Sequence, residues 1–587
     1  MSLRTQKNLP RTTVHTVVFV LLSGFAVWWY SYMNPYLTLF YREQTQMFLF
    51  TWDYFFRYLN LPGGITAYVA SFLIQFFYIR WLGILIYICI FLGIYATFQR
   101  VLDHFSLFRG SFVIAFIPGV LFLPASVSML FDIADELAVI IALWGFIALT
   151  VVASKRFYYL LIPLTITVLY ALTGGCILIS LSLFLLYSVV RQAKNAVRPI
   201  VTALLSLFFP LALWYFFYMV SFRDACFALT HFRYPDAQLF DARSIAWLSV
   251  VVLPVIGILF KKIRSNKKWI FFSETVLAVA IIICIIKQHR PDFEQIIKMS
   301  FHAQNHQWED VLKTNEKTAV SALSCFYTNL ALQKTGQMAE KMFQYEQIGI
   351  SGLIVDLKDQ FSCAAKSELF YQLGWINPAR HYACESMSGY SYIKEPNIQN
   401  MKRLLECAVV RHDSDLASKY EKIMNKTLFY RDYVQKQEYP SEINMNNMLI
   451  RNMPAVLESI MEANSHNQAI FEYLMAYYLL EREYEKAKNC FDRYFSNFPY
   501  SQIPTHYAEF LALYKRLKLL DDSFYAQYPV SKEIRERFDM MDTLISSNMT
   551  KKIMKTVESG FKNTYWFYVR FPLVNIQTVQ QDEKKIY

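Results

Sequence analysis

The feature that most constrains this chain is a series of long apolar runs that fills its first half and stops near residue 287. Each run extends over about 20 residues with few charges, which is the length that an α-helix needs to cross a bilayer. Over the whole chain 55% of the residues are hydrophobic and 18% are charged, a more apolar composition than that of ordinary soluble proteins. The sequence therefore predicts an all-α protein in two parts: a polytopic transmembrane domain over 1–287 and a soluble helical-repeat domain over 288–587.

We expect about nine membrane spans, at 12–31, 81–98, 111–131, 137–153, 157–172, 174–190, 199–220, 244–260 and 269–287. The apolar stretch 157–190 is too long for one crossing, and Gly174-Gly175 offers the break for a tight hairpin. The run 62–80 has two interpretations, a further span or a helix that lies along the interface in the first outer loop.

Basic residues beside the spans favour the interfacial interpretation, because cytoplasmic loops carry an excess of Lys and Arg. With nine spans, fifteen basic residues fall inside and six fall outside. The inside set comprises Arg4, Lys7, Arg11, Arg100, Arg109, Lys155, Arg156, Arg191, Lys194, Arg198 and the five basic residues of 261–268, and the outside set comprises Arg42, Arg57, Arg80, Arg223, Arg233 and Arg243. This predicts a multi-pass protein of the cytoplasmic (inner) membrane with a cytoplasmic N-terminus and an extracytoplasmic C-terminal domain. It also explains the net charge of +12 without a nucleic-acid partner.

Three carboxylates stand in the short gap "FDIADELA", residues 131–138, which this topology places outside. Asp132, Asp135 and Glu136 are spaced i, i+3 and i+4, so they share one face if a helix begins there. Oxygen ligands of this kind suit Mg²⁺ or Mn²⁺, which predicts a metal site. The alternative is that the acids mark a solvated loop and give the next helix a favourable acidic N-terminus.

The loop 221–243, "SFRDACFALTHFRYPDAQLFDAR", adds basic groups to the same side. Arg223 and Arg233 suit a lipid-linked phosphate because guanidinium groups offer paired donors to phosphate oxygens. His231 near a carboxylate can act as an acid or a base. We expect a substrate-binding role for these three residues, and the alternative is an interfacial loop anchored to lipid headgroups.

This order of a signal-anchor span, a long acidic first outer loop and a D-x-x-D-E run in the second outer loop resembles the GT-C class of membrane glycosyltransferases. The resemblance implies a polyprenyl-phosphate-linked sugar as donor, with acids of the two loops binding a metal or activating the acceptor. It gives Glu43 or Asp53 the catalytic role of the first-loop acid, and Asp132, Asp135 and Glu136 the metal. Glu43 departs from the pattern, because it follows the first span by about a dozen residues.

The C-terminal half contains a helical repeat pattern. Residues 468–499, "QAIFEYLMAYYLLEREYEKAKNCFDRYFSNFP", resemble a tetratricopeptide repeat, and weaker copies stand at 326–345, 369–387 and 404–424, with turns expected near 336, 376 and 413. Stacked repeats form an α-solenoid with a concave surface for a protein partner, and the alternative is an array that only braces the membrane domain.

The tail 565–587 breaks the helical pattern, as an extended or capping element does. "NLALQKTGQMAEKMF" and "LGWINPARHYACESM" resemble an uncharacterised family of bacterial inner-membrane proteins with such repeats.

The leading hypothesis is a GT-C-like transferase that acts outside the membrane, with its repeats recruiting partners. The competing hypothesis is a non-enzymatic, membrane-anchored scaffold of the cell envelope. The sequence alone leaves open whether the protein is an enzyme. A transporter is disfavoured, because no expected span has an ionisable residue deep in its apolar core.

Overall fold

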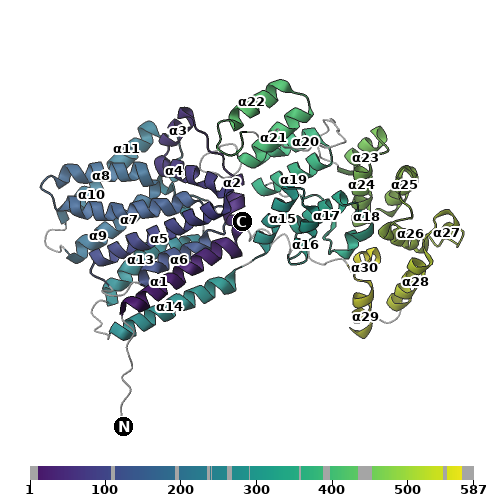
Figure 1. Cartoon of the computed structure of the whole chain (residues 1–587), viewed down its shortest axis with the longest axis horizontal. Coiled ribbons are helices and arrows are strands. Elements are labelled where there is room, and N and C mark those ends of the chain that lie inside the picture. The colour runs from purple at the N-terminus through teal and green to yellow at the C-terminus, as the bar shows by residue number, and fades with distance from the viewer. Residues whose placement is uncertain are drawn as a thin grey trace, which may run out of the picture. The chain divides into compact units, whose positions relative to one another are not determined.

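The computed structural model (Figure 1) describes residues 11–107, 113–191, 197–234, 238, 241–260, 267–289, 291–355, 359–387, 397–431, 433, 453–546 and 551–571. Within these residues the chain forms helices and no strand, which confirms the all-α class. Contacts divide the chain into two compact units. The first comprises Met1–Pro291 with Tyr390–Ile398 and Asn425–Arg431, and the second comprises the rest.

The first unit contains the apolar helices. They are α1 (Arg11–Trp28), α2 (Arg42–Gln44), α3 (Trp52–Leu59), α4 (Gly64–Ile74), α5 (Arg80–His104), α6 (Ile117–Ala125), α7 (Ile133–Ala153), α8 (Tyr158–Thr173), α9 (Ile177–Arg191), α10 (Val197–Leu205), α11 (Phe208–Phe217), α12 (Phe222–Phe227), α13 (Ala242–Phe260) and α14 (Lys267–Gln288).

Six helical stretches of the described chain have the length and apolar composition of membrane spans: Thr16–Met33, Arg80–His104, Ile133–Ala153, Tyr158–Val190, Val197–Phe217 and Ala242–Leu259. These stretches support an integral membrane protein. The stretch Tyr158–Val190 is interrupted at Gly174, where φ is +54°, and α8 and α9 both pack against α7 (Figure 1). The helix α4 has 11 residues, too few to cross a bilayer. The expected total of nine spans remains a prediction.

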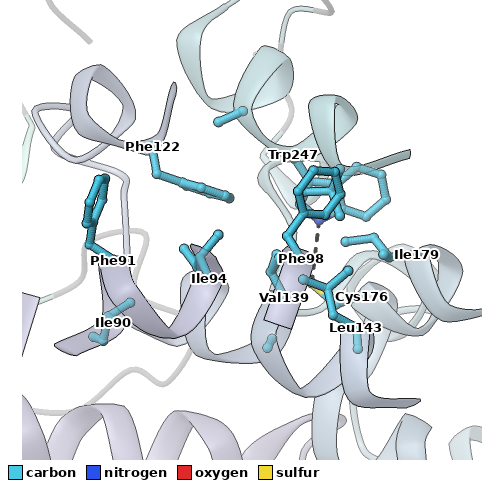
Figure 2. Close-up of a cluster of buried hydrophobic side chains, with 14 of the residues drawn as sticks. Ile90, Phe91, Ile94, Phe98, Phe122, Val139, Leu143, Cys176, Ile179 and Trp247 are labelled. Carbon is cyan, nitrogen blue, oxygen red and sulfur yellow. Dashed lines mark hydrogen bonds between the residues drawn. The ribbon is translucent and has the colours of Figure 1, made fainter. Parts of the chain in front are cut away.

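The helix α7 lies at the centre of this unit, because α4, α5, α8 and α9 all pack against it. Its buried face carries small residues at helical spacing, Ala138, Ala142 and Gly145, which let neighbouring backbones approach closely. The hydroxyl of Ser180 on α9 donates a hydrogen bond of 2.6 Å to the carbonyl of Ala142. Figure 2 shows a cluster of buried side chains that includes Val139 and Leu143 of α7, Ile179 of α9 and Trp247 of α13. In this cluster Trp247 Nε1 donates a hydrogen bond of 3.5 Å to the sulfur of Cys176.

The second unit consists of helices that pack in succession. They are α15 (Asp292–Gln304), α16 (Trp308–Asn315), α17 (Ala322–Lys334), α18 (Met338–Lys341), α19 (Gln360–Gln372), α20 (Ile376–Ser386), α21 (Ile398–Val410), α22 (Ser414–Met424), α23 (Met453–Ala463), α24 (Gln468–Glu481), α25 (Tyr484–Tyr494), α26 (Thr505–Leu517), α27 (Phe524–Gln527), α28 (Lys532–Ser546), α29 (Lys551–Phe561) and α30 (Tyr565–Arg570). Ile398, the first residue of α21, belongs to the first unit by its contacts.

The expected turns of the repeat region coincide with left-handed residues between paired helices. Gly336 separates α17 from α18, Gly374 separates α19 from α20, and His412 separates α21 from α22, with φ of +67°, +74° and +54°. The helix-turn-helix pairs are therefore present, while their identity as tetratricopeptide repeats stays a prediction. Of the tail, 565–570 form α30 and are therefore not extended, and the Tyr565 amide at its start donates a hydrogen bond to the buried Glu509. A capping role for the tail stays a prediction. Residues 572–587 lie outside the described part of the chain.

Candidate functional site

The three acids of residues 131–138 lie at the N-terminus of α7. Asp132 is the N-cap residue, and its carboxylate accepts a hydrogen bond of 2.9 Å from the backbone N–H of Ala134. A carboxylate in this position satisfies a helix amide that would otherwise lack a partner. Asp135 and Glu136 follow in the first turn, where the helix dipole favours negative charge. Capping therefore accounts for Asp132, and the other two acids have different surroundings.

Glu136 is the most enclosed of the three acids, with only 2% of its surface exposed. Its Oε2 atom has no hydrogen-bond partner among the described residues. Arg42 lies within electrostatic reach of Glu136. The Arg42 guanidinium is itself held by the carbonyls of Met129, at 2.9 Å, and Ser128, so it ties the first outer loop to the segment before α7.

Asp135 lies within electrostatic reach of arginines from two different loops. These are Arg233 and Arg243, which come from the 221–243 loop, and Arg42, which comes from the first outer loop. A predicted metal acid, Asp135, therefore lies within electrostatic reach of a predicted phosphate-binding residue, Arg233. We call Arg42, Asp135, His231, Arg233, Asp241 and Arg243 the mouth cluster.

Asp241 organises the basic side of the mouth cluster. Its Oδ2 atom lies 2.9 Å from His231 Nε2 and accepts hydrogen bonds from Arg243 Nη2 at 2.9 Å and Nε at 3.2 Å. Its Oδ1 atom accepts from the amide of Ser244 at 3.0 Å, which caps the first turn of α13. Burial alone would raise the pKa of Asp241, but the contacts with His231, Ser244 and Arg243 outweigh it and hold the pKa well below its ordinary value.

The three arginines of this loop meet different partners. Arg243 keeps one buried donor, Nη1, without an acceptor among the described residues. Arg233 donates to the Tyr234 hydroxyl at 2.9 Å and lies over that ring at 4.8 Å. Arg223 is exposed and donates to the Tyr234 carbonyl at 2.9 Å. Arg243 therefore has a buried guanidinium N–H that no protein group of the described chain occupies.

The loops that carry the cluster are packed tightly against the glycine turn. The amide of Gly175 donates a hydrogen bond of 2.8 Å to the carbonyl of Ala228, and the Tyr170 hydroxyl donates to the carbonyl of Ala225 at 3.1 Å. The start of α4 joins the same assembly, because the Thr66 hydroxyl donates to the carbonyl of Leu172 at 2.6 Å. The first outer loop, the Gly174-Gly175 turn and the 221–243 loop thus meet at one end of the helices.

The two candidate acids of the first loop occupy different environments. Glu43 is buried, and its Oε1 atom accepts a hydrogen bond of 2.7 Å from the Tyr430 hydroxyl while Oε2 accepts one of 2.5 Å from Gln44 Nε2. Asp53 is exposed on α3. The contacts of Glu43 are those of an anchored carboxylate, and sequence reasoning had no signal for Tyr430, which lies 387 residues further along the chain.

The described residues do not provide a donor set for a metal ion. Within that part of the chain no three His, Cys, Asp or Glu side chains gather as metal ligands. Asp132 turns its carboxylate to the α7 amides, and Asp135 lies among arginines. Asp132, Asp135 and Glu136 therefore do not gather as one ligand set in the described chain, and the Mg²⁺ or Mn²⁺ site stays a prediction from sequence alone.

Arg243 was expected among the basic groups of the 221–243 loop, but neither Asp241 nor Arg243 was predicted as a site residue. A signal was available, since an acid directly before an apolar helix is a typical N-cap. Sequence reasoning also missed an open cleft of about 500 Å³ in the second unit. There Arg403 pairs with Glu368 at 2.5 Å and Glu406 at 3.0 Å and stacks on Tyr371 at 3.8 Å.

Comparisons with known proteins give a family and no function. A family model described as a family of unknown function (DUF6057) matches residues 8–572. No curated protein and no solved structure matches the chain.

Proposed function

We propose that this chain, which belongs to the family of unknown function DUF6057, is a membrane-embedded, GT-C-like transferase that uses a polyprenyl-phosphate-linked sugar at the extracytoplasmic face. The observation that carries the proposal is the position of Arg243. Its Nη1 donor is buried without an acceptor among the described residues, and its guanidinium lies within electrostatic reach of Asp135. A buried donor of this kind suits an anionic oxygen, and phosphate is the anion that a lipid-linked donor brings to a membrane surface.

The mouth cluster supplies the groups that such a transfer needs. The acceptor oxygen bonds to the anomeric carbon of the sugar, and the bond from that carbon to the phosphate oxygen breaks with its electron pair on the phosphate. Arg233 and Arg243 stabilise the charge of the leaving polyprenyl phosphate. Asp135 takes the proton that the acceptor loses. Asp241 acts as a positioning residue, because it holds His231 and Arg243 in place.

The orientation of the chain follows from the same proposal. The ring of His289, just after α14, lies 5.3 Å from that of Trp29, at the end of the first apolar helix that leads into the first outer loop. This contact supports an α14 that ends on the same side as the loop after the first apolar helix, which is the extracytoplasmic side if the N-terminus is cytoplasmic. The second unit then recruits the acceptor or a protein partner.

The binding of the lipid-linked donor can be tested with polyprenyl phosphate. The full chain is reconstituted in nanodiscs with undecaprenyl phosphate or with uncharged undecaprenol, and native mass spectrometry counts the retained lipid. We expect the phosphate to be retained at least about tenfold better than the alcohol, and Arg243→Gln to remove that preference. The matched control is Arg57→Gln, which changes an exposed arginine of α3. Equal retention of the two lipids by the unaltered protein contradicts the proposal.

A scaffold of the cell envelope is the second candidate, and the cleft of the second unit favours it. Polar side chains from α19 and α21 line that cleft, among them Ser367, Gln399 and Lys402. The two candidate functions can be distinguished by complementing a deletion strain with variants of the chain. A transferase requires Asp135, so Asp135→Asn fails to complement while Lys402→Ala succeeds. A scaffold gives the reverse result.

A further inference from the structure

Another pocket lies in the first unit, and none of the mouth-cluster residues lines it. It encloses about 320 Å³, open solvent at its entrance included, and is lined by two stretches of the loop region between α1 and α5 and by residues from much later in the chain. Glu43, Gln46 and Gln75 line it from the first region, and Phe429 and Tyr430 line it from the later segment. We call this space the acceptor pocket.

The acceptor pocket is rich in hydrogen-bond acceptors that no protein donor satisfies. The Oε1 atoms of Gln46 and Gln75 are buried and have no partner within the described chain, and the same holds for Oε1 of the adjacent Gln44. Gln44 is itself 4% exposed. A buried acceptor without a donor costs about 1–3 kcal/mol. Several such atoms in one place therefore point to a ligand that brings donors.

The orientation of two of these amides is fixed by their neighbours. The Nε2 atom of Gln44 donates to the Glu43 carboxylate at 2.5 Å, and Nε2 of Gln75 donates to the Phe72 carbonyl at 2.9 Å. Both partners are acceptors, so a reversed amide would set two acceptors face to face. The free atoms of Gln44 and Gln75 are therefore carbonyl oxygens.

The rest of the acceptor pocket is apolar, and its surroundings suit a membrane interface. Phe48 and Phe429 belong to its wall. Close by in the chain, Trp52 is 75% exposed and Tyr78 is 55% exposed, and Tyr78 stacks on Phe429 with ring centroids 4.9 Å apart. Exposed Trp and Tyr side chains are typical of the headgroup level of a bilayer. A lipid can therefore reach this pocket with its headgroup.

We propose that the acceptor pocket binds the primary ammonium group of an aminophospholipid headgroup. An ammonium group has three N–H donors and no acceptor, which matches the carbonyl oxygens of Gln46 and Gln75 and the carboxylate of Glu43. The carboxylate also balances the positive charge in a partly buried site. This inference is independent of the transferase proposal, because it uses none of the residues of the mouth cluster.

Competition between two lipids that differ only at nitrogen tests the inference. The full chain is placed in nanodiscs with equal amounts of phosphatidylethanolamine and phosphatidylcholine of the same acyl chains, and native mass spectrometry measures which lipid stays bound. The three methyl groups of choline remove every N–H donor. We expect phosphatidylethanolamine to be retained at least about fivefold better, and Glu43→Gln and Gln75→Leu each to bring the ratio close to one.

Two controls keep the result interpretable. Asp103→Asn removes an exposed acid of α5 that does not line the pocket and should leave the preference unchanged. Gln75→Leu leaves the hydrogen bond between Tyr430 and Glu43 in place, so it reports on the pocket even if Glu43→Gln unfolds the protein. Equal retention of the two lipids by the unaltered chain overturns the inference. If soluble glycerophosphoethanolamine displaces the lipid completely, the claim that the ligand is a lipid is wrong, and the pocket binds a soluble amine instead.

Discussion

The hydroxyl of Tyr430 donates a hydrogen bond of 2.7 Å to Oε1 of Glu43, and both side chains are buried. The same segment meets the first outer loop a second time, where the amide of Phe50 donates to the carbonyl of Lys426 at 3.1 Å. Residues 425–431 therefore pack as part of the membrane unit, although they follow α22 of the helical-repeat region.

Tyr430→Phe should lower the stability of this unit by about 1–3 kcal/mol, because a buried carboxylate oxygen loses a donor. The measurement is the midpoint of thermal unfolding of the purified chain in detergent. Tyr32→Phe serves as the control, since Tyr32 is 77% exposed and should change the midpoint little. An unchanged midpoint for both variants would show that the hydrogen bond adds nothing to stability.

Gly175→Ala should destabilise the end of the membrane unit at which the Gly174-Gly175 turn packs against residues 225–228. A Cβ atom on Gly175 would lie 2.4 Å from the carbonyl oxygen of Cys226 and 2.9 Å from the Cα of Phe227, so backbone must move. Overpacking of this kind costs about 1–3 kcal/mol. Yield and unfolding midpoint provide the measurement. Gly24→Ala is the matched control, because a Cβ there meets nothing within 4 Å; a similar loss in both variants argues against the steric explanation.

Asp241→Asn should destabilise the protein at neutral pH, and this destabilisation should disappear in acid. The pKa of Asp241 is held below its ordinary value of 3.8, so its contribution to stability is present above that value and disappears as the pH falls towards the folded pKa. The difference in unfolding midpoint between the unaltered chain and the variant should be constant from about pH 5 to about pH 8 and shrink below about pH 4. A difference that grows in acid contradicts this assignment.

Arg403→Met should strongly destabilise the second unit, because it leaves Glu368 and Glu406 buried without their cation. Loss of one partner from a buried ion pair typically costs about 3–5 kcal/mol. Limited proteolysis of the full chain, followed at peptides of α19 and α21, measures the loss. Arg493→Met breaks a pair with Glu462 in which both side chains are more than half exposed, and should cost about 1 kcal/mol or less.

Sequence reasoning recovered the features that are set by local pattern. Apolar runs identified the α5, α7 and α13 helices, because a span must be continuous and apolar whatever its neighbours are. Glycine marked the break between α8 and α9, since φ at Gly174 is +54° and other residues rarely adopt that conformation. Likewise, the turns at Gly336, Gly374 and His412 follow from helix periodicity and its interruptions.

The candidate site was recovered only in part, because charge at a position does not reveal where a side chain points. Asp132, Asp135 and Glu136 look equivalent in sequence, yet one caps α7, one lies among arginines and one is buried with a free oxygen. Asp241 and Arg243 lie close to one another in sequence, and their contact is local. The contact between Tyr430 and Glu43 joins residues 387 positions apart and leaves no trace in either local pattern.

What the sequence determined by itself is therefore the all-α class, the existence of membrane helices and the helix-turn-helix pairs, since each depends on periodicity over a few turns. Tertiary structure alone decided which charged side chains meet. The free energy of burying a charge depends on the partners that distant segments bring to it. Those segments are brought together by helix packing around α7 and by the return of residues 425–431 to the first outer loop.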